Sequence, residues 1–225
     1  MSKFVWALAV ALTGTAAAQE PPEAAAGGVP PEVIASAKAA VVKLGQDVTR
    51  GEFRAAIERM NPQWRKRLAG RTPGGEPELL RRVDETAKAM ARQGVSVVSC
   101  VVGPEPCQAF EVGIGKQQVR NPQGEMVEVQ VHTQWLVLVP TVTRYRQVRL
   151  DDPKAPPLIV EKIGFQVAVA DKGKDNWTFI DGSGLSVIEL RREFVNLPQD
   201  LKLPPVRSRE IGKPGMPGEQ DPRSR

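Results

Sequence analysis

The hydrophobic pattern of this chain changes its period at Val95, and this change limits the fold more than any other feature of the sequence. Before it, apolar residues recur every three or four positions, as in an amphipathic helix, beginning with Ile34, Ala37, Val41 and Leu44. After it, β-branched residues alternate with polar ones, as in strands. Helices followed by antiparallel strands with short turns predict an α+β fold with helices on one sheet face.

Four helical segments are expected before the change of period. They cover about residues 31–44, 53–60, 62–68 and 77–90. Prolines stand at the start of the first segment, and Asn61–Pro62 supplies a cap and a first-turn proline for the third. The fourth is expected to bury one apolar side, and Gly94 is placed for a left-handed C-terminal cap.

The clearest strand lies between residues 127 and 139. Valine, threonine and tryptophan occupy every second position, including Trp135, and polar residues such as His132 stand between them. This alternation predicts one buried face, which holds Trp135, and one wet face, which holds His132. Pro140 is expected to bend the strand or open its ladder. Further strands are expected at 95–102, 108–120, 144–150, 158–170 and 177–180, with a final helix at 186–194.

The first eighteen residues have the layout of a secretory signal. A short basic start precedes the uncharged apolar run Phe4–Leu12, and Ala16–Ala18 supplies the small residues that a signal peptidase reads. The run is too short to span a bilayer, and no cysteine follows it for a lipid anchor. We therefore expect residues 1–18 to be removed, leaving a periplasmic or extracellular protein without a transmembrane anchor.

One domain is expected between two segments that lack periodicity. Residues 19–30 and 198–225 are rich in proline, glycine or charge, so we expect a flexible N-terminal segment and a disordered tail. Residues 31–197 are numerous enough for a single domain with a proper core. The formal charge of +5 is small, and part of it lies in the tail. A nucleic-acid-binding face concentrates more charge, so no nucleic-acid partner is expected.

Cysteine and histidine are scarce in this chain. An oxidising compartment favours a disulfide between the two cysteines, Cys100 and Cys107. A tight turn would face Cys100 toward Ala109, so the disulfide requires a wider loop or a bulge. A structural zinc site normally takes four ligands from cysteine and histidine, and His132 is the one histidine. We therefore expect no metal and no cofactor.

The end of the last predicted strand carries the sequence Trp177-Thr178-Phe179-Ile180-Asp181-Gly182-Ser183-Gly184, after a turn at Lys172–Asn176. Together with the helical break at Gly51-Glu52-Phe53, it resembles the nuclear transport factor 2-like (cystatin-like) superfamily, its exported bacterial members in particular, over residues 31–196. The resemblance implies a cone-shaped roll, in which N-terminal helices pack in the concave face of a bent antiparallel sheet. It also implies association of two copies through the sheet.

Enzymes of this superfamily include ketosteroid isomerases, polyketide cyclases and scytalone dehydratase. They place Asp, His or Tyr inside the cone, where a dry environment shifts the pKa of these groups. The inward strand positions of this chain hold Val, Ile, Phe and Trp, so no acid or base carries over. We therefore expect a non-enzymatic module that binds a small apolar ligand in the cone, or a protein through the open sheet face. The alternatives are an isomerase or lyase that uses Tyr145 with an unidentified acid, and an envelope protein tethered by its tail.

The candidate ligand contacts are three aromatic residues, Trp135, Tyr145 and Phe165. Trp135 and Phe165 fall on the apolar faces of their strands. Tyr145 faces away from its neighbours Arg144 and Arg146, so it is expected to point inward. Together with Arg149, these arginines form a cationic strand surface. It could bind an anion or an acidic partner, or it could keep a sheet edge from pairing with another chain.

Overall fold

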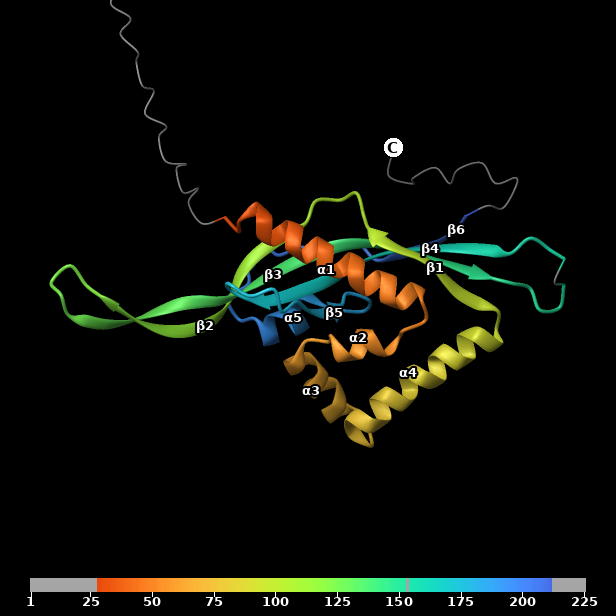
Figure 1. Ribbon diagram of the computed structural model, residues 1–225, viewed down its shortest axis with the longest axis horizontal. Helices are drawn as coiled ribbons and strands as arrows, with labels where there is room; N and C mark the ends of the chain where they lie inside the picture. The colour runs from red at the N-terminus through yellow and green to blue at the C-terminus, as the bar shows by residue number, and fades with distance from the viewer. Residues whose placement is uncertain (1–27, 153, 212–225) are drawn as a thin grey trace, which may run out of the picture.

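The structure, a computed structural model, describes residues 28–152 and 154–211, which form an α+β fold of five helices and a six-stranded antiparallel sheet (Figure 1). The helices are α1 (Pro31–Thr49), α2 (Arg54–Glu58), α3 (Pro62–Arg71), α4 (Gly75–Arg92) and α5 (Val187–Glu193). The strands are β1 (Val95–Val102), β2 (Gln108–Arg120), β3 (Met126–Gln147), β4 (Leu158–Asp171), β5 (Thr178–Asp181) and β6 (Arg207–Ile211). The predicted signal sequence lies outside the described residues.

The helix boundaries follow from local capping. Asn61 caps α3, since its side-chain oxygen accepts from the backbone N–H groups of Gln63 and Trp64. Gly94, just past α4, has a φ of 69°, as expected for a left-handed cap. Ser186 and Glu189 form a reciprocal capping box at the start of α5.

The sheet is built on two long central strands, β3 and β4. Two shorter strands share the outer edge of each: β2 and β1 lie along β3, and β5 and β6 lie along β4. β3 continues through Pro140, contrary to the predicted interruption. The Pro140 carbonyl accepts a hydrogen bond from the backbone N–H of Gly103 in the β1–β2 loop. Because the carbonyl and nitrogen of one strand residue point to the same side, the Pro140 nitrogen, which has no hydrogen, faces the gap between β2 and β1 and not β4. No β3–β4 hydrogen bond is lost there, and the ladder stays intact.

The sheet carries a hydrophobic core on each face, not on one face as the sequence predicted. On the α1 face, α1 covers Val137, Val139, Ala168, Ala170 and Phe179. On the opposite face, here called the α5 face, Trp64 of α3 and Leu190 of α5 pack with Leu136, Leu138, Phe165, Val167 and Ile180. The predicted wet face of the strand is therefore wrong for residues 135–139. Their continuous apolar sequence, Trp-Leu-Val-Leu-Val, is typical of a strand buried on both faces.

The alternating pattern belongs instead to a projecting arm. Residues 113–120 of β2 and 126–133 of β3 form a two-stranded ribbon that extends from the body (Figure 1). β4 pairs with β3 only from Gln134 onward, so this part of β3 has one partner strand. His132 lies exposed on the arm, as predicted. Gly113 at the base has a φ of 67°, a conformation that favours glycine.

The chain after α5 returns to the body. Leu197 and Leu201 are buried in the α5-face core, and β6 pairs with residues 159–163 of β4. The structure thus differs from the predicted disordered tail over residues 198–211. The reason is tertiary, because the partners of this segment are a core and a strand edge distant in the sequence.

Candidate ligand cavity

A cavity of about 300 Å³ lies on the α1 face, between the sheet and the C-terminal half of α1. This volume is at the lower end of the range for small-molecule sites. Its apolar lining includes Val41 and Leu44 of α1, Ile57 of α2 and Phe179 of β5. The sheet supplies Thr141, Thr143 and Tyr145 from β3 and Lys162 and Gly164 from β4.

The cavity arises where the sheet presents small side chains to α1. Under the N-terminal half of α1, Val137, Val139 and Ala168 fill the same face. Further along β3 and β4, the paired residues Thr141 and Gly164 leave space instead. Thr141 and Gly164 interrupt the aliphatic residues that otherwise face α1 from β3 and β4. This interruption is the feature of the sequence from which the position of the cavity could have been predicted.

Glycine also sets how closely α1 approaches the sheet. A Cβ atom added to Gly45 would lie 2.7 Å from the carbonyl oxygen of Cys100 on β1. No side chain fits at such a distance without a shift, so α1 touches β1 at this point. The cavity opens beside this contact, between the helix and β3–β4.

Polar groups gather at one side of the cavity. The Lys162 ammonium donates to Ser183 Oγ over 2.7 Å, and the Ser183 backbone N–H donates to Asp181 Oδ1 over 3.1 Å. Burial raises the pKa of the half-buried Tyr145 phenol above its usual value, and the nearby Cys100 and Asp181 act in the same direction. Tyr145 is therefore protonated at neutral pH and can donate a hydrogen bond. Sequence reasoning missed Lys162, Asp181 and Ser183 as site residues.

Of the three predicted aromatic contacts, Tyr145 lines this cavity from the α1 face of β3. Trp135 shares its face but lies ten residues earlier in β3, roughly 33 Å away along an extended strand. There the Lys172 ammonium sits 4.2 Å from the centre of its ring. Phe165 borders the cavity, yet its ring belongs to the α5-face core. Strand alternation alone could not reveal that Phe165 and Tyr145 lie on opposite faces, because they belong to different strands.

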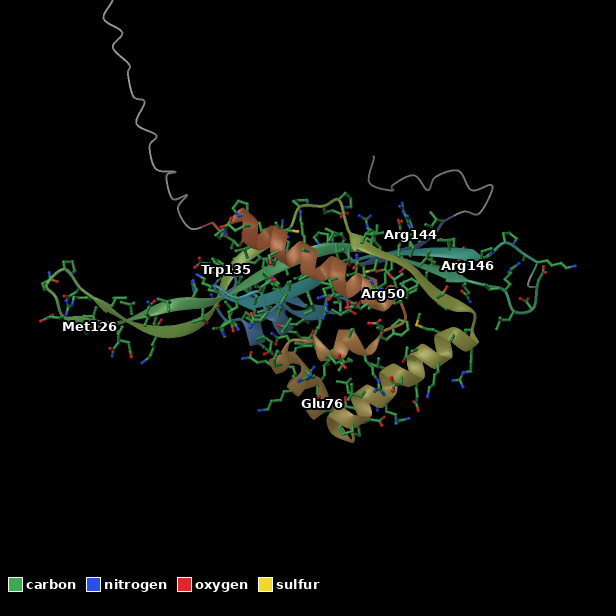
Figure 2. All side chains as sticks on the ribbon, viewed as in Figure 1. Arg50, Glu76, Met126, Trp135, Arg144 and Arg146 are labelled. Carbon is green, nitrogen blue, oxygen red and sulfur yellow. The ribbon has the colours of Figure 1, made fainter. Side chains whose placement is uncertain are left out.

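The predicted cationic surface is organised around a buried carboxylate. Arg144 Nε lies 3.0 Å from Glu161 Oε2, and Arg209 of β6 contacts Glu161 Oε1 at 2.6 Å. Hydrogen bonds from Arg209 and Arg144 lower the pKa of Glu161. Arg144 thus has an acidic partner within the chain. It lies with Arg146 at the end of the sheet opposite Trp135 (Figure 2), and both Arg146 and Arg149 are exposed.

The predicted disulfide is not formed, since Cys100 and Cys107 are both free. Cys100 lies against Gly45 of α1. Cys107 packs in the α1-face core, where burial raises its thiol pKa and the charge of Lys38 opposes this effect. Lys38 and Gly45 are two helical turns apart, so the two thiols lie near different parts of α1.

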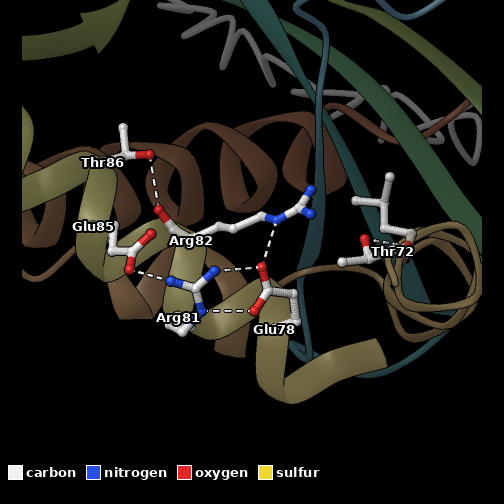
Figure 3. A network of polar contacts seen from close by, with 7 residues as sticks. Thr72, Glu78, Arg81, Arg82, Glu85 and Thr86 are labelled. Carbon is white, nitrogen blue, oxygen red and sulfur yellow. Dashed lines mark hydrogen bonds and ion pairs between the residues drawn. The ribbon is translucent and has the colours of Figure 1, made fainter. Parts of the chain in front are cut away.

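Most other charges on the helices form ion pairs. On α4, Glu78 binds both Arg81 and Arg82, and Arg81 also binds Glu85 (Figure 3). Hydrogen bonds from the two arginines lower the pKa of Glu78 to about 2. This network lies on the exposed side of α4. The sequence predicted that the apolar residues of this helix would be buried, but in the structure they are only half-buried. It is typical of a solvated helix surface and not of a binding site.

Within residues 28–152 and 154–211, no group of three His, Cys, Asp or Glu side chains gathers in a way that could hold a metal ion. None of the helices in that part of the chain is long and apolar enough to cross a membrane. Comparisons of the chain with protein-family models, with curated proteins and with solved structures find no match.

Proposed function

We propose that this protein is an exported, non-enzymatic binding module that holds a small molecule with an apolar body in the cavity beneath α1. The observation that carries the proposal is the cavity itself, with apolar walls from α1, α2 and β5 and a group of polar side chains that includes Lys162, Asp181 and Ser183. A site of this kind orients a ligand by a few polar contacts and gains affinity from apolar burial. Export rests on the signal-like residues 1–18.

Binding of a small molecule is favoured over docking of a protein on an open sheet face. The centre of the sheet is covered on one side by α1 and on the other by α3, α5 and the segment around Leu201. A helix packed over one face of an antiparallel sheet, with a cavity between them, is also consistent with a cone of the nuclear transport factor 2-like kind. The proposal therefore includes membership of this protein in the nuclear transport factor 2-like superfamily.

Calorimetric titration with 1-octanol tests the proposal, because this probe has an apolar body and a neutral head. We expect one binding site per chain. Thr143→Leu should weaken binding, since the larger side chain fills the cavity, whereas Thr86→Leu on the exposed side of α4 should not. Equal binding by the wild type and Thr143→Leu would contradict the proposed site.

One observation favours a second function, that of a small-molecule isomerase or lyase. Tyr145 and Asp181 both line the cavity, and Asp181 contributes to the raised pKa of the phenol. A protonated phenol beside a carboxylate provides the acid and base that such chemistry requires. Wild type, Tyr145→Phe and Asp181→Asn should be compared on a panel of enolisable and dehydratable substrates. Turnover that both substitutions remove would establish the enzyme and overturn the binding-module proposal.

A further inference from the structure

We propose that the ligand carries a single carboxylate group, bound at the polar side of the cavity by Lys162, Ser183 and Tyr145. This inference rests on the proposed binding function and specifies the chemistry of its ligand. It follows from the charge of Lys162, the hydrogen-bond donors beside it and the size of the cavity.

Lys162 is a cation that forms no direct ion pair with a described carboxylate. Of the side chains that the structure describes, no carboxylate lies within ion-pair distance of its ammonium group, which donates to the neutral Ser183 hydroxyl instead. An ammonium group has three N–H donors, so two remain for a ligand. The adjacent residue Glu161, on the opposite sheet face, is held by two arginines. The two faces of the sheet therefore differ: two arginines bind the Glu161 carboxylate directly, whereas the Lys162 ammonium is connected to the Asp181 carboxylate only through Ser183.

The groups around Lys162 add donors suited to an anion. Because Ser183 Oγ accepts from Lys162, its own hydroxyl hydrogen is available to another acceptor. The protonated Tyr145 phenol lines the same cavity and supplies a further donor. A carboxylate has two oxygens and about four acceptor positions, so it can satisfy all three groups.

Asp181 limits the charge that the site can accept. Its carboxylate also lines the cavity and accepts from the Ser183 backbone N–H. The single ammonium can offset one negative charge of a ligand, whereas a dianion such as a phosphate monoester would meet more repulsion from Asp181. The site is therefore matched to a monocarboxylate.

The cavity volume restricts the apolar body of the ligand. A space of about 300 Å³ corresponds to roughly ten water molecules at about 30 Å³ each. The ligand is therefore expected to have on the order of ten non-hydrogen atoms. The walls formed by Val41, Leu44 and Phe179 require most of these atoms to be apolar. A medium-chain fatty acid or an aromatic carboxylic acid has this size and polarity.

Titration calorimetry at pH 7 with octanoate and with 1-octanol tests the inference, because the two probes share the chain and differ in the head group. We expect the wild type to bind octanoate about tenfold more tightly, since a hydrogen bond to a charged group contributes more than a neutral one. Lys162→Met should remove this preference, so that the variant binds octanoate no more tightly than 1-octanol. A cooperative urea denaturation transition shows separately that the variant is folded. Lys66→Met, which removes an equal charge from the exposed side of α3, is the matched control.

Each outcome separates the inference from the proposed function. Equal affinity of the wild type for octanoate and 1-octanol would overturn the carboxylate inference and leave the binding module standing. Equal losses of octanoate affinity in Lys162→Met and Lys66→Met would also overturn it, because they would show general charge attraction only. Binding of neither probe would overturn both proposals.

Discussion

The arm and the centre of the sheet contain the same strand, β3, in two different environments. In the arm, residues 126–133 pair only with β2, and their side chains are exposed or half-buried. In the centre, residues 136–139 lie between two strands and beneath two layers of side chains, and all four are fully buried. The contrast shows that regular alternation marks the part of a strand with solvent nearby, whereas a continuous apolar run marks the part covered on both faces.

The two environments predict different sensitivity to substitution. An isolated two-stranded ribbon is marginally stable in water, so the arm depends on its attachment to the body. The centre contributes to both cores, where deletion of apolar atoms leaves cavities. The following substitutions test this difference, in order of decreasing expected effect.

Phe165→Ala should have the largest effect, because its ring is buried in the α5-face core. We expect the free energy of unfolding to fall by about 3–5 kcal/mol, measured by urea denaturation. Val129→Ala in the arm is the comparison, with an expected loss within about 0.5 kcal/mol. Similar losses for the two variants would show that the arm is as well packed as the centre.

Gly113→Ala should act at the base of the arm. Gly113 has a φ of 67°, and an added Cβ would lie 2.8 Å from Thr133 Oγ1. A non-glycine residue in this conformation costs about 1–3 kcal/mol, and hydrogen exchange should increase in the arm more than in the centre. Gly70→Ala is the control, because Gly70 lies within α3 with open space around it. It should stabilise the protein by about 0.5–1 kcal/mol.

Acid should weaken the attachment of β6 through Glu161. Since Arg209 and Arg144 lower the pKa of Glu161 below its ordinary value of 4.5, the folded state favours the carboxylate. The resulting stability is present above the ordinary pKa and is lost as the pH falls through the lowered folded-state pKa. Glu161→Gln should reduce the loss of stability in acid and increase hydrogen exchange in residues 207–211 at neutral pH. Glu128→Gln in the arm, which removes an exposed pair with Lys116, should leave the acid profile unchanged.

His132→Ala should have the smallest effect. The imidazole lies exposed on the arm, with Nδ1 3.0 Å from Glu111 Oε2. Exposed pairs of this kind contribute little, so the free energy of unfolding should change by no more than about 0.5 kcal/mol. A loss comparable to that of Phe165→Ala would show that the base of the arm is part of the core.

The sequence by itself determined the five helices, the positions of β1, β2, β4 and β5, and several of their ends, but it divided β3 near Pro140 and did not predict β6. Helical periodicity up to residue 92 and strand periodicity from residue 95 correspond to the observed elements. The cap at Asn61 and the left-handed Gly94 were also predicted, and the structure confirms both. These features depend on neighbours a few residues away, so their physical causes are present in the local sequence.

Only the tertiary structure decided which side chains share a site. Trp135 and Phe165 were expected beside Tyr145, yet Trp135 lies ten residues earlier in β3 and Phe165 has its ring on the opposite face. Lys162, Asp181 and Ser183 join Tyr145 because β4 lies beside β3 and β5 lies along the other edge of β4, and the cavity forms where small residues meet below α1. Alternation divides the side chains of a strand between two faces. Which face a distant helix covers, and which strands lie adjacent, depends on contacts between segments far apart in the sequence.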